Sequence, residues 1–148
     1  GIGKEFIKLL ENTNMTKVYK MPVLMAFYNH GDIRMEVTET ELLASWKEFF
    51  STGTNWKDLD TGITYEQYCK TSDKDHIKRI IKMPVNFLVK SGKGFFVKKE
   101  GSALALRDEM KGIIKNPVLA EQMKDVIEYR TMDYYQRRYK EQMTAFLQ

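Results

Sequence analysis

Hydrophobic and polar positions follow two different periods along this chain, and each period predicts a different kind of element. In five stretches the apolar residues recur every three to four positions, the spacing of one face of an α-helix. These stretches are residues 4–10, 20–29, 39–51, 73–91 and 107–148. Short β-prone runs typical of strands occupy residues 33–37, 95–99 and 103–106. The pattern therefore predicts a mainly α-helical fold with a minor β component.

All three prolines stand in the same frame, Lys-x-Pro-Val, at Pro22, Pro84 and Pro117. Proline is tolerated in the first turn of a helix and disfavours helical geometry in the residue before it. We therefore expect a helix to begin near Pro22, a kinked or restarted helix at Pro84, and one long C-terminal helix after Pro117. Apolar residues cover nearly the whole circumference of the helix predicted at 20–29, which places that helix at the centre of the core.

The expected order of elements is helix, strand, helix, helix, hairpin, helix. This is the order of a winged helix-turn-helix, with the hairpin at residues 95–106 as its wing. Thr38 and Glu41 predict a capping box at the start of the second helix. The segment 53–72 is longer than the usual connection to the third helix. Within it, the stretch 56–62, polar apart from Trp56 and Leu59, is expected to wrap the surface, and Thr64 is expected to cap a short helical turn through Tyr65, Tyr68 and Cys69. We expect a single domain, with a winged-helix-like core at about 16–106 and a helical extension at 107–148.

The composition narrows the class of protein further. With 43% hydrophobic and 30% charged residues, the chain is expected to fold as an ordinary globular domain. We expect no signal peptide, because the first residues lack an apolar segment, and no apolar run reaches the roughly 20 residues that a membrane span requires. A single cysteine excludes an internal disulfide and fits the reducing cytoplasm. Because the chain starts with glycine rather than methionine, we expect a fragment of a larger protein. We expect that protein to be cytoplasmic and to have no membrane partner.

The sequence contains no recognisable catalytic constellation. His30 and His76 lack the spaced partners of a zinc site and are expected at the surface, and Cys69 is expected to be an idle or buried thiol. Glu109 and Lys111 resemble half of a restriction-type nuclease motif, but the pattern around them is helical where that motif needs a strand. No phosphate-binding loop is present. We therefore expect no catalytic residue, metal or cofactor, with nuclease activity as a minor alternative.

Basic residues gather in two of the predicted elements. They are Lys78, Arg79 and Lys82 on the kinked helix, and Lys93, Lys98 and Lys99 around the wing. If these elements pack as in a winged helix, the cations line one face and neutralise DNA phosphates, which releases counterions. The net charge of +4 is compatible with such binding, and a solvated charged surface is the alternative interpretation.

The C-terminal segment interleaves aromatic and basic side chains. Candidates for contact with a partner are Tyr134, Tyr135, Arg138 and Tyr139. Such a helix can stack on bases, dock on a partner protein or form a homo-oligomer. Aromatic residues at helical spacing more often pack inward while arginines extend to water, so a docked helix is favoured here. The oligomeric state stays open.

Several stretches resemble one known family. They are residues 19–27, 49–50, 56–59, 82–88, 95–96, 127–131 and 137–139. Together they resemble the C-terminal region of bacterial DEAD/DEAH-box, superfamily 2 helicase-like proteins. In that family the ATPase chemistry belongs to two upstream motor domains, and none of their motifs occurs here. The resemblance implies a non-catalytic accessory domain that contacts DNA and the motor domains of the same parent chain. The alternative is an interaction or dimerisation module that docks on the motor domains through its C-terminal helix.

Overall fold

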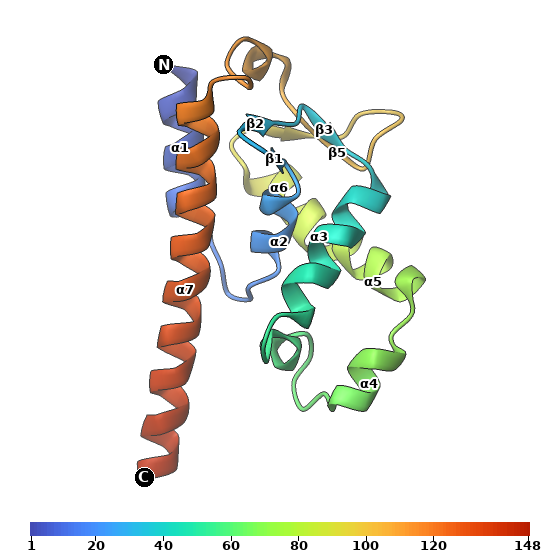
Figure 1. The fold of residues 1–148 in the computed structure, drawn as a ribbon, viewed down its shortest axis with the longest axis vertical. Coiled ribbons are helices and arrows are strands. Elements are labelled where there is room, and N and C mark those ends of the chain that lie inside the picture. Colours follow the sequence, from blue (N-terminus) through green and yellow to red (C-terminus); the bar gives the residue numbers. More distant parts are fainter.

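The longest helix, α7 (Pro117–Leu147), runs along one side of a body of shorter helices and two small sheets (Figure 1). The structure is a computed structural model that describes residues 1–148. It is 64% helical, with small antiparallel sheets. The predicted fold class, mainly helical with a small β component and a long C-terminal helix, is therefore confirmed.

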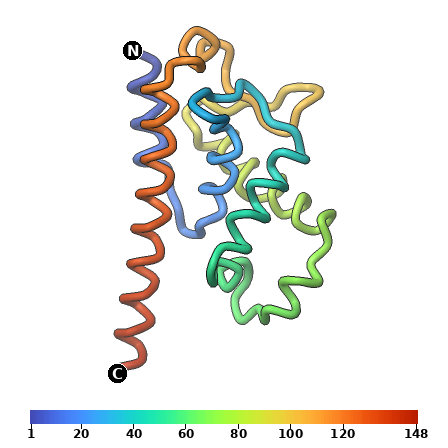
Figure 2. The backbone as a smooth tube through the Cα atoms, in the orientation of Figure 1, coloured from blue at the N-terminus to red at the C-terminus, as the bar shows by residue number.

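Helix α1 (Ile2–Asn12) packs against the first half of α7 and joins it to the core. Its buried residues are Phe6, Leu9 and Leu10, which share one helical face. Arg130 on α7 donates hydrogen bonds to the carbonyls of Leu10 (3.0 Å) and Thr13 (2.6 Å). These carbonyls lie at the end of α1, where a helix has no partners of its own for them. Figure 2 shows the N-terminus beside the start of α7 and the C-terminus at its far end.

Helix α2 (Lys20–Met25) occupies the centre of the body, as expected, and its residues from Lys20 to Leu24 are all buried. It is shorter than predicted. Strand β1 (Tyr28–Asn29) follows it and pairs with β2 (Asp32–Ile33). His30 and Gly31 both have positive φ, at 49° and 91°, as a two-residue type I′ hairpin turn requires. The local turn thus ends the helix, and the strand predicted at 33–37 divides into β2 and β3 (Glu36–Val37).

Helix α3 (Glu39–Ser51) begins at the predicted capping box. The Glu41 amide donates to Thr38 Oγ1 (3.1 Å), and the Thr38 amide donates to the Glu41 carboxylate (2.9 Å). A 3-10 turn (Asn55–Asp58) and helix α4 (Tyr65–Lys70) follow α3. Thr64 caps helix α4 as predicted. The expectation that residues 56–62 wrap the surface is wrong for Asp58 and Leu59, which are buried against the body.

The kinked helix is found as predicted around Pro84. Helix α5 (Asp73–Ile80) continues through a π-helical turn (Ile81–Val85) into α6 (Asn86–Ser91). Pro84 has no amide hydrogen to donate, so a regular α-helix cannot pass through it without losing a hydrogen bond. The wider π turn accommodates the proline and keeps both helices in one continuous run.

A three-stranded antiparallel sheet joins the hairpin to the strand before α3. Strand β5 (Leu104–Leu106) lies between β3 and β4 (Phe96–Val97), and all three residues of β5 are buried. A 3-10 turn (Asp108–Gly112) then leads to α7. From α2 to β5 the order of elements follows the predicted winged-helix-like order, with the β1–β2 hairpin added after α2 and α4 inserted before the third helix. A single hydrophobic cluster of 29 buried residues connects this part with α1 and α7.

Candidate nucleic-acid interface

A pocket of about 460 Å³ opens between α5, the π turn and the loop before α2. Its charged lining residues are the cations Lys17, Lys78, Arg79 and Lys82 and the carboxylates Asp60 and Asp75. Lys17, Lys78 and Lys82 form no ion pair, whereas Asp60 is paired with Arg79. Cations that lack a protein partner are available to an anionic ligand.

A second pocket of about 510 Å³ continues the first. The two pockets share Lys17, Tyr19 and Met83, and the second adds Lys20, Lys90 and Phe87 among its lining residues. We call the two together the basic groove, with the first as its α5 pocket and the second as its α6 pocket. The groove is lined by six cations and two carboxylates, and both carboxylates lie in the α5 pocket.

Arg79 forms a wall of the groove and is held by internal contacts. Its guanidinium pairs with Asp60 at 2.6 Å, donates to the Tyr19 hydroxyl at 3.2 Å and also bonds the Leu59 carbonyl. The hydrogen bond to Asp60 raises the pKa of Arg79. A DNA phosphate would have to compete with these acceptors, so the predicted role of Arg79 in phosphate contact is secondary to its role in shaping the wall.

Lys20 lies in the α6 pocket and is only 7% exposed. Its ammonium donates to Thr13 Oγ1 (3.1 Å) and to the Asn14 carbonyl (2.6 Å), and no carboxylate lies within ion-pair distance. Burial, and then the nearby positive charge of Arg130, lower the pKa of Lys20. The α6 pocket therefore contains a desolvated cation without a counter-ion.

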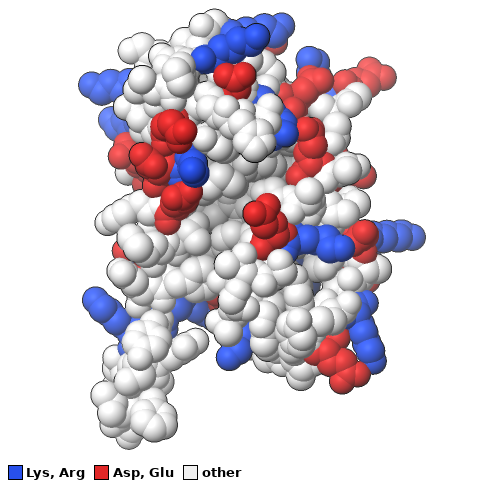
Figure 3. Space-filling view, viewed as in Figure 1, with Lys and Arg blue, Asp and Glu red and all other residues white.

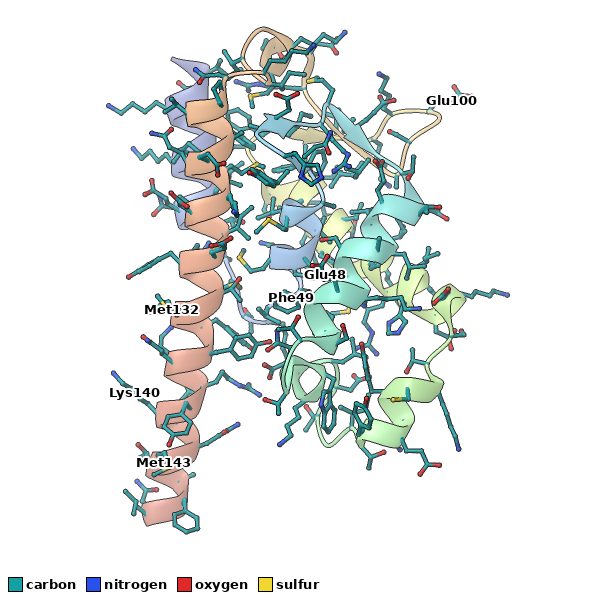
Figure 4. The ribbon with its side chains drawn as sticks, in the orientation of Figure 1. Glu48, Phe49, Glu100, Met132, Lys140 and Met143 are labelled. Carbon is teal, nitrogen blue, oxygen red and sulfur yellow. The ribbon has the colours of Figure 1, made fainter.

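The wing cations lie apart from the groove. Neither pocket is lined by Lys93, Lys98 or Lys99. Lys99 pairs with Glu36 on β3 at 2.7 Å, and Figure 4 shows Glu100 at the outer end of the wing. The face drawn in Figure 3 carries acidic and basic side chains intermixed. The six cations expected on one face are thus divided into a groove group and a wing group.

Of the predicted partner-binding residues, three face the body of the molecule. Tyr134 is 4% exposed, the Tyr135 hydroxyl is buried without a hydrogen bond, and Arg138 pairs with the buried Asp58 at 2.7 Å. Burial, and then the charge of Asp58, raise the pKa of Tyr135. Only Tyr139, at 64% exposed, lies on a surface that a partner can reach. The helix is therefore docked up to Arg138, as favoured from the sequence.

One single residue differs from expectation. His76 was expected at the surface but is buried, because α5 packs on α3 and the His76 ring accepts a hydrogen bond from Trp46 Nε1 at Nδ1 (3.1 Å). Burial lowers the pKa of this histidine.

Cys69, expected to be an idle or buried thiol, is exposed on α4. No group of three or more His, Cys, Asp or Glu side chains is arranged to hold a metal ion.

The sequence pattern missed Lys17 and Phe87 as residues of the site. Lys17 lies in the loop before α2, far from α5 in the chain, and Phe87 has the helical spacing of an ordinary core residue. Only the packing of α2 against the π turn brings Lys17 beside Lys78 and Lys82. No local signal in the sequence predicts this neighbourhood.

Comparisons of the chain with family models, curated proteins and solved structures find no match. None of its helices combines the length and the apolar character that crossing a bilayer requires. The geometry of the basic groove is therefore the basis for the functional interpretation.

Proposed function

We propose that this chain is a non-catalytic nucleic-acid-binding domain that holds DNA along the basic groove. The observation that carries the proposal is the convergence of Lys17, Lys78 and Lys82, three cations without carboxylate partners, on one pocket. Each phosphate that such a cation neutralises releases condensed counterions and favours binding. We expect this binding to be weakly sequence-specific at most, because phosphate contacts carry no sequence information.

The resemblance to helicase-like proteins extends this proposal. In that role the domain acts in the cytoplasm as an accessory part of a helicase-type ATPase and keeps DNA close to the motor domains of the same parent chain. The wing, with Lys93, Lys98 and Lys99, supplies an additional and weaker contact. The accessory role is supported by the sequence resemblance alone, whereas the DNA contact is also supported by the groove.

Titration of fluorescent duplex and single-stranded DNA at several salt concentrations tests the DNA contact. Three phosphate contacts give a slope of log K against log salt of about −3 for duplex and about −2 for a single strand. Binding that is absent at low salt, or that does not depend on salt, would contradict the proposal.

A second candidate function is a protein-interaction or dimerisation module. Four large apolar side chains near the end of α7 are exposed: Tyr139, Met143, Phe146 and Leu147. Figure 4 labels Lys140 and Met143 in the last turns of α7, toward its free end. An exposed apolar patch of this kind is typical of an interaction surface.

Sedimentation velocity over a range of concentrations tests this second candidate. Self-association predicts a mass that increases with concentration and returns to the monomer mass in a Phe146→Ser variant. A monomer at every concentration would argue against dimerisation and leave docking on the motor domains as the form of this candidate.

A further inference from the structure

We propose that the α6 pocket is a subsite for one nucleotide of a single strand, with the phosphate on its lysines and the base against Phe87. The proposal rests on the proposed function, because it assigns a ligand to one part of the same groove. It goes further in naming the strandedness of the nucleic acid and a stacking residue.

The charge of the α6 pocket has one sign. Its lining includes Lys17, Lys20 and Lys90 and no Asp or Glu. A lysine ammonium has three donors, and Lys20 uses two of them on Thr13 and Asn14. Its neighbour Arg130 also has no carboxylate partner, since both of its hydrogen bonds go to backbone carbonyls. The buried Lys20 and the partly buried Arg130 repel each other because no anion lies between them, so a phosphate bound beside Lys20 relieves that repulsion.

Neutral donors complete the polar side of the pocket. Asn14 and Thr16 line it together with the lysines, as does Ser91, whose hydroxyl already donates to the Phe87 carbonyl at 2.7 Å. Hydroxyl and amide groups commonly contact phosphate oxygens in protein complexes with nucleic acids. The pocket thus presents both charged and neutral donors to an anion, and no carboxylate opposes them.

The other side of the pocket is apolar and aromatic. Met83, Pro84 and Phe87 line it, and Phe87 is 47% exposed although it is a large hydrophobic residue. Met83, Phe87 and Lys90 follow the spacing i, i+4, i+7, which aligns them along one face of the run from the π turn into α6. The stacking ring and the lysine therefore lie on the same side of this helix.

The size and chemistry together select a nucleotide. A volume of about 510 Å³ falls in the range of small-molecule sites. Proteins that bind single strands combine a basic path for the backbone with aromatic rings for the bases. A base within a duplex is stacked on both faces and cannot reach Phe87, so the pocket fits a single strand.

Calorimetric titration with the 5′-phosphorylated thymidine dinucleotide, inorganic phosphate and thymidine tests the subsite on the full chain. We expect the dinucleotide to bind at least about tenfold more tightly than phosphate or thymidine alone. Base stacking contributes enough that Phe87→Ala should weaken the dinucleotide about fivefold or more, without weakening phosphate. Lys90→Met should weaken both ligands. Lys140→Met, at an exposed lysine on α7, is the matched control and should change neither.

Three other outcomes overturn the subsite. Equal affinity for phosphate and dinucleotide would show an anion site without a base contact. An unchanged dinucleotide affinity in Phe87→Ala and Lys90→Met would place the ligand elsewhere. If the dinucleotide does not bind but long DNA does, and substitutions at Lys78 and Lys82 weaken the binding of long DNA, only the subsite is rejected. If long DNA does not bind either, the subsite and the proposed function are both rejected. Phe87 and Lys90 are exposed, so these substitutions should leave the fold intact, whereas Lys20 also holds the loop before α2.

Discussion

The basic groove and the wing are both rich in lysine, but the structure surrounds these lysines differently. Lys17, Lys78 and Lys82 converge on a concave surface without carboxylate partners. In the wing, Lys99 is paired with Glu36 and Glu100 follows it in the chain. We therefore propose the groove rather than the wing as the main phosphate-binding surface, because its three lysines are unpaired and lie on a concave surface.

The two regions also differ in how they are supported. The groove wall contains Arg79, which bonds Tyr19, Leu59 and Asp60 from other parts of the chain. The wing is an exposed connection between the short strands β4 and β5. A ligand gains more from a surface that is already ordered, because less conformational entropy is lost on binding. Both differences predict that DNA affinity depends more on the groove than on the wing.

The largest expected effect comes from reversing the groove charges. The variant Lys78→Glu/Lys82→Glu should lose DNA affinity on the order of 100-fold at low salt, since two phosphate contacts become repulsive. The matched wing variant, Lys98→Glu/Lys99→Glu, should lose no more than about threefold. Fluorescence anisotropy at one fixed salt concentration measures both. Equal losses would show that the wing and the groove contribute alike.

The second effect concerns the groove wall. Arg79→Met removes the bonds to Leu59, Tyr19 and Asp60 and should lower the free energy of unfolding by about 2 kcal/mol. Urea denaturation followed by circular dichroism measures the change. The control is Lys98→Met on the exposed wing, which should leave the midpoint unchanged. An Arg79→Met midpoint equal to that of wild type would reject the structural role of this guanidinium.

The third effect is a loss of folding stability at acid pH, caused by His76, a buried residue of α5. Burial holds the pKa of His76 below its ordinary value. The positive charges of Lys47 and Arg79 lower this pKa further, whereas the negative charges of Asp73 and Asp75 raise it. The unfolded chain takes up a proton near pH 6.5, while the folded chain keeps His76 neutral to lower pH. The stability is therefore complete above pH 6.5 and falls below it, by up to about 1.4 kcal/mol per pH unit, until the folded pKa is reached.

Urea denaturation between pH 5 and 7.5, followed by tryptophan fluorescence, measures this acid sensitivity. Trp46 is a suitable probe because it donates to the His76 ring. A His76→Gln variant should lose the slope in this window whatever its overall stability. A slope that persists unchanged in the variant would assign the acid sensitivity to other groups.

The smallest effect tests whether the ion pair between Lys99 and Glu36 reduces the contribution of the wing to DNA binding. Glu36→Gln releases Lys99, whose pKa is raised by its hydrogen bond to Glu36. We expect DNA affinity to rise by no more than about threefold at low salt and to match wild type at high salt, where exposed charges are screened. The thermal midpoint should hardly change, because the pair is exposed. A larger gain would make the wing a principal contact.

Local signals predicted much of the fold. The capping box at Thr38, the kink at Pro84, the start of α7 at Pro117 and the β4–β5 hairpin were all readable, because each depends on residues a few positions apart. The end of α2 was misplaced, since the turn at His30 and Gly31 competes with the helical pattern and forms a hairpin. His76 was misplaced because its burial depends on α3, a separate helix.

The sequence by itself determined the helical class, most element boundaries and the excess of positive charge. It proposed Lys78 and Lys82 as candidate contacts, but it did not show that Lys17, Lys20 and Phe87 lie in the same groove. It also could not show that Arg79 is held by Asp60 and Lys99 by Glu36. Those facts belong to tertiary structure, because pairing and burial depend on which distant segments pack together. Periodicity records only which side of an element faces inward.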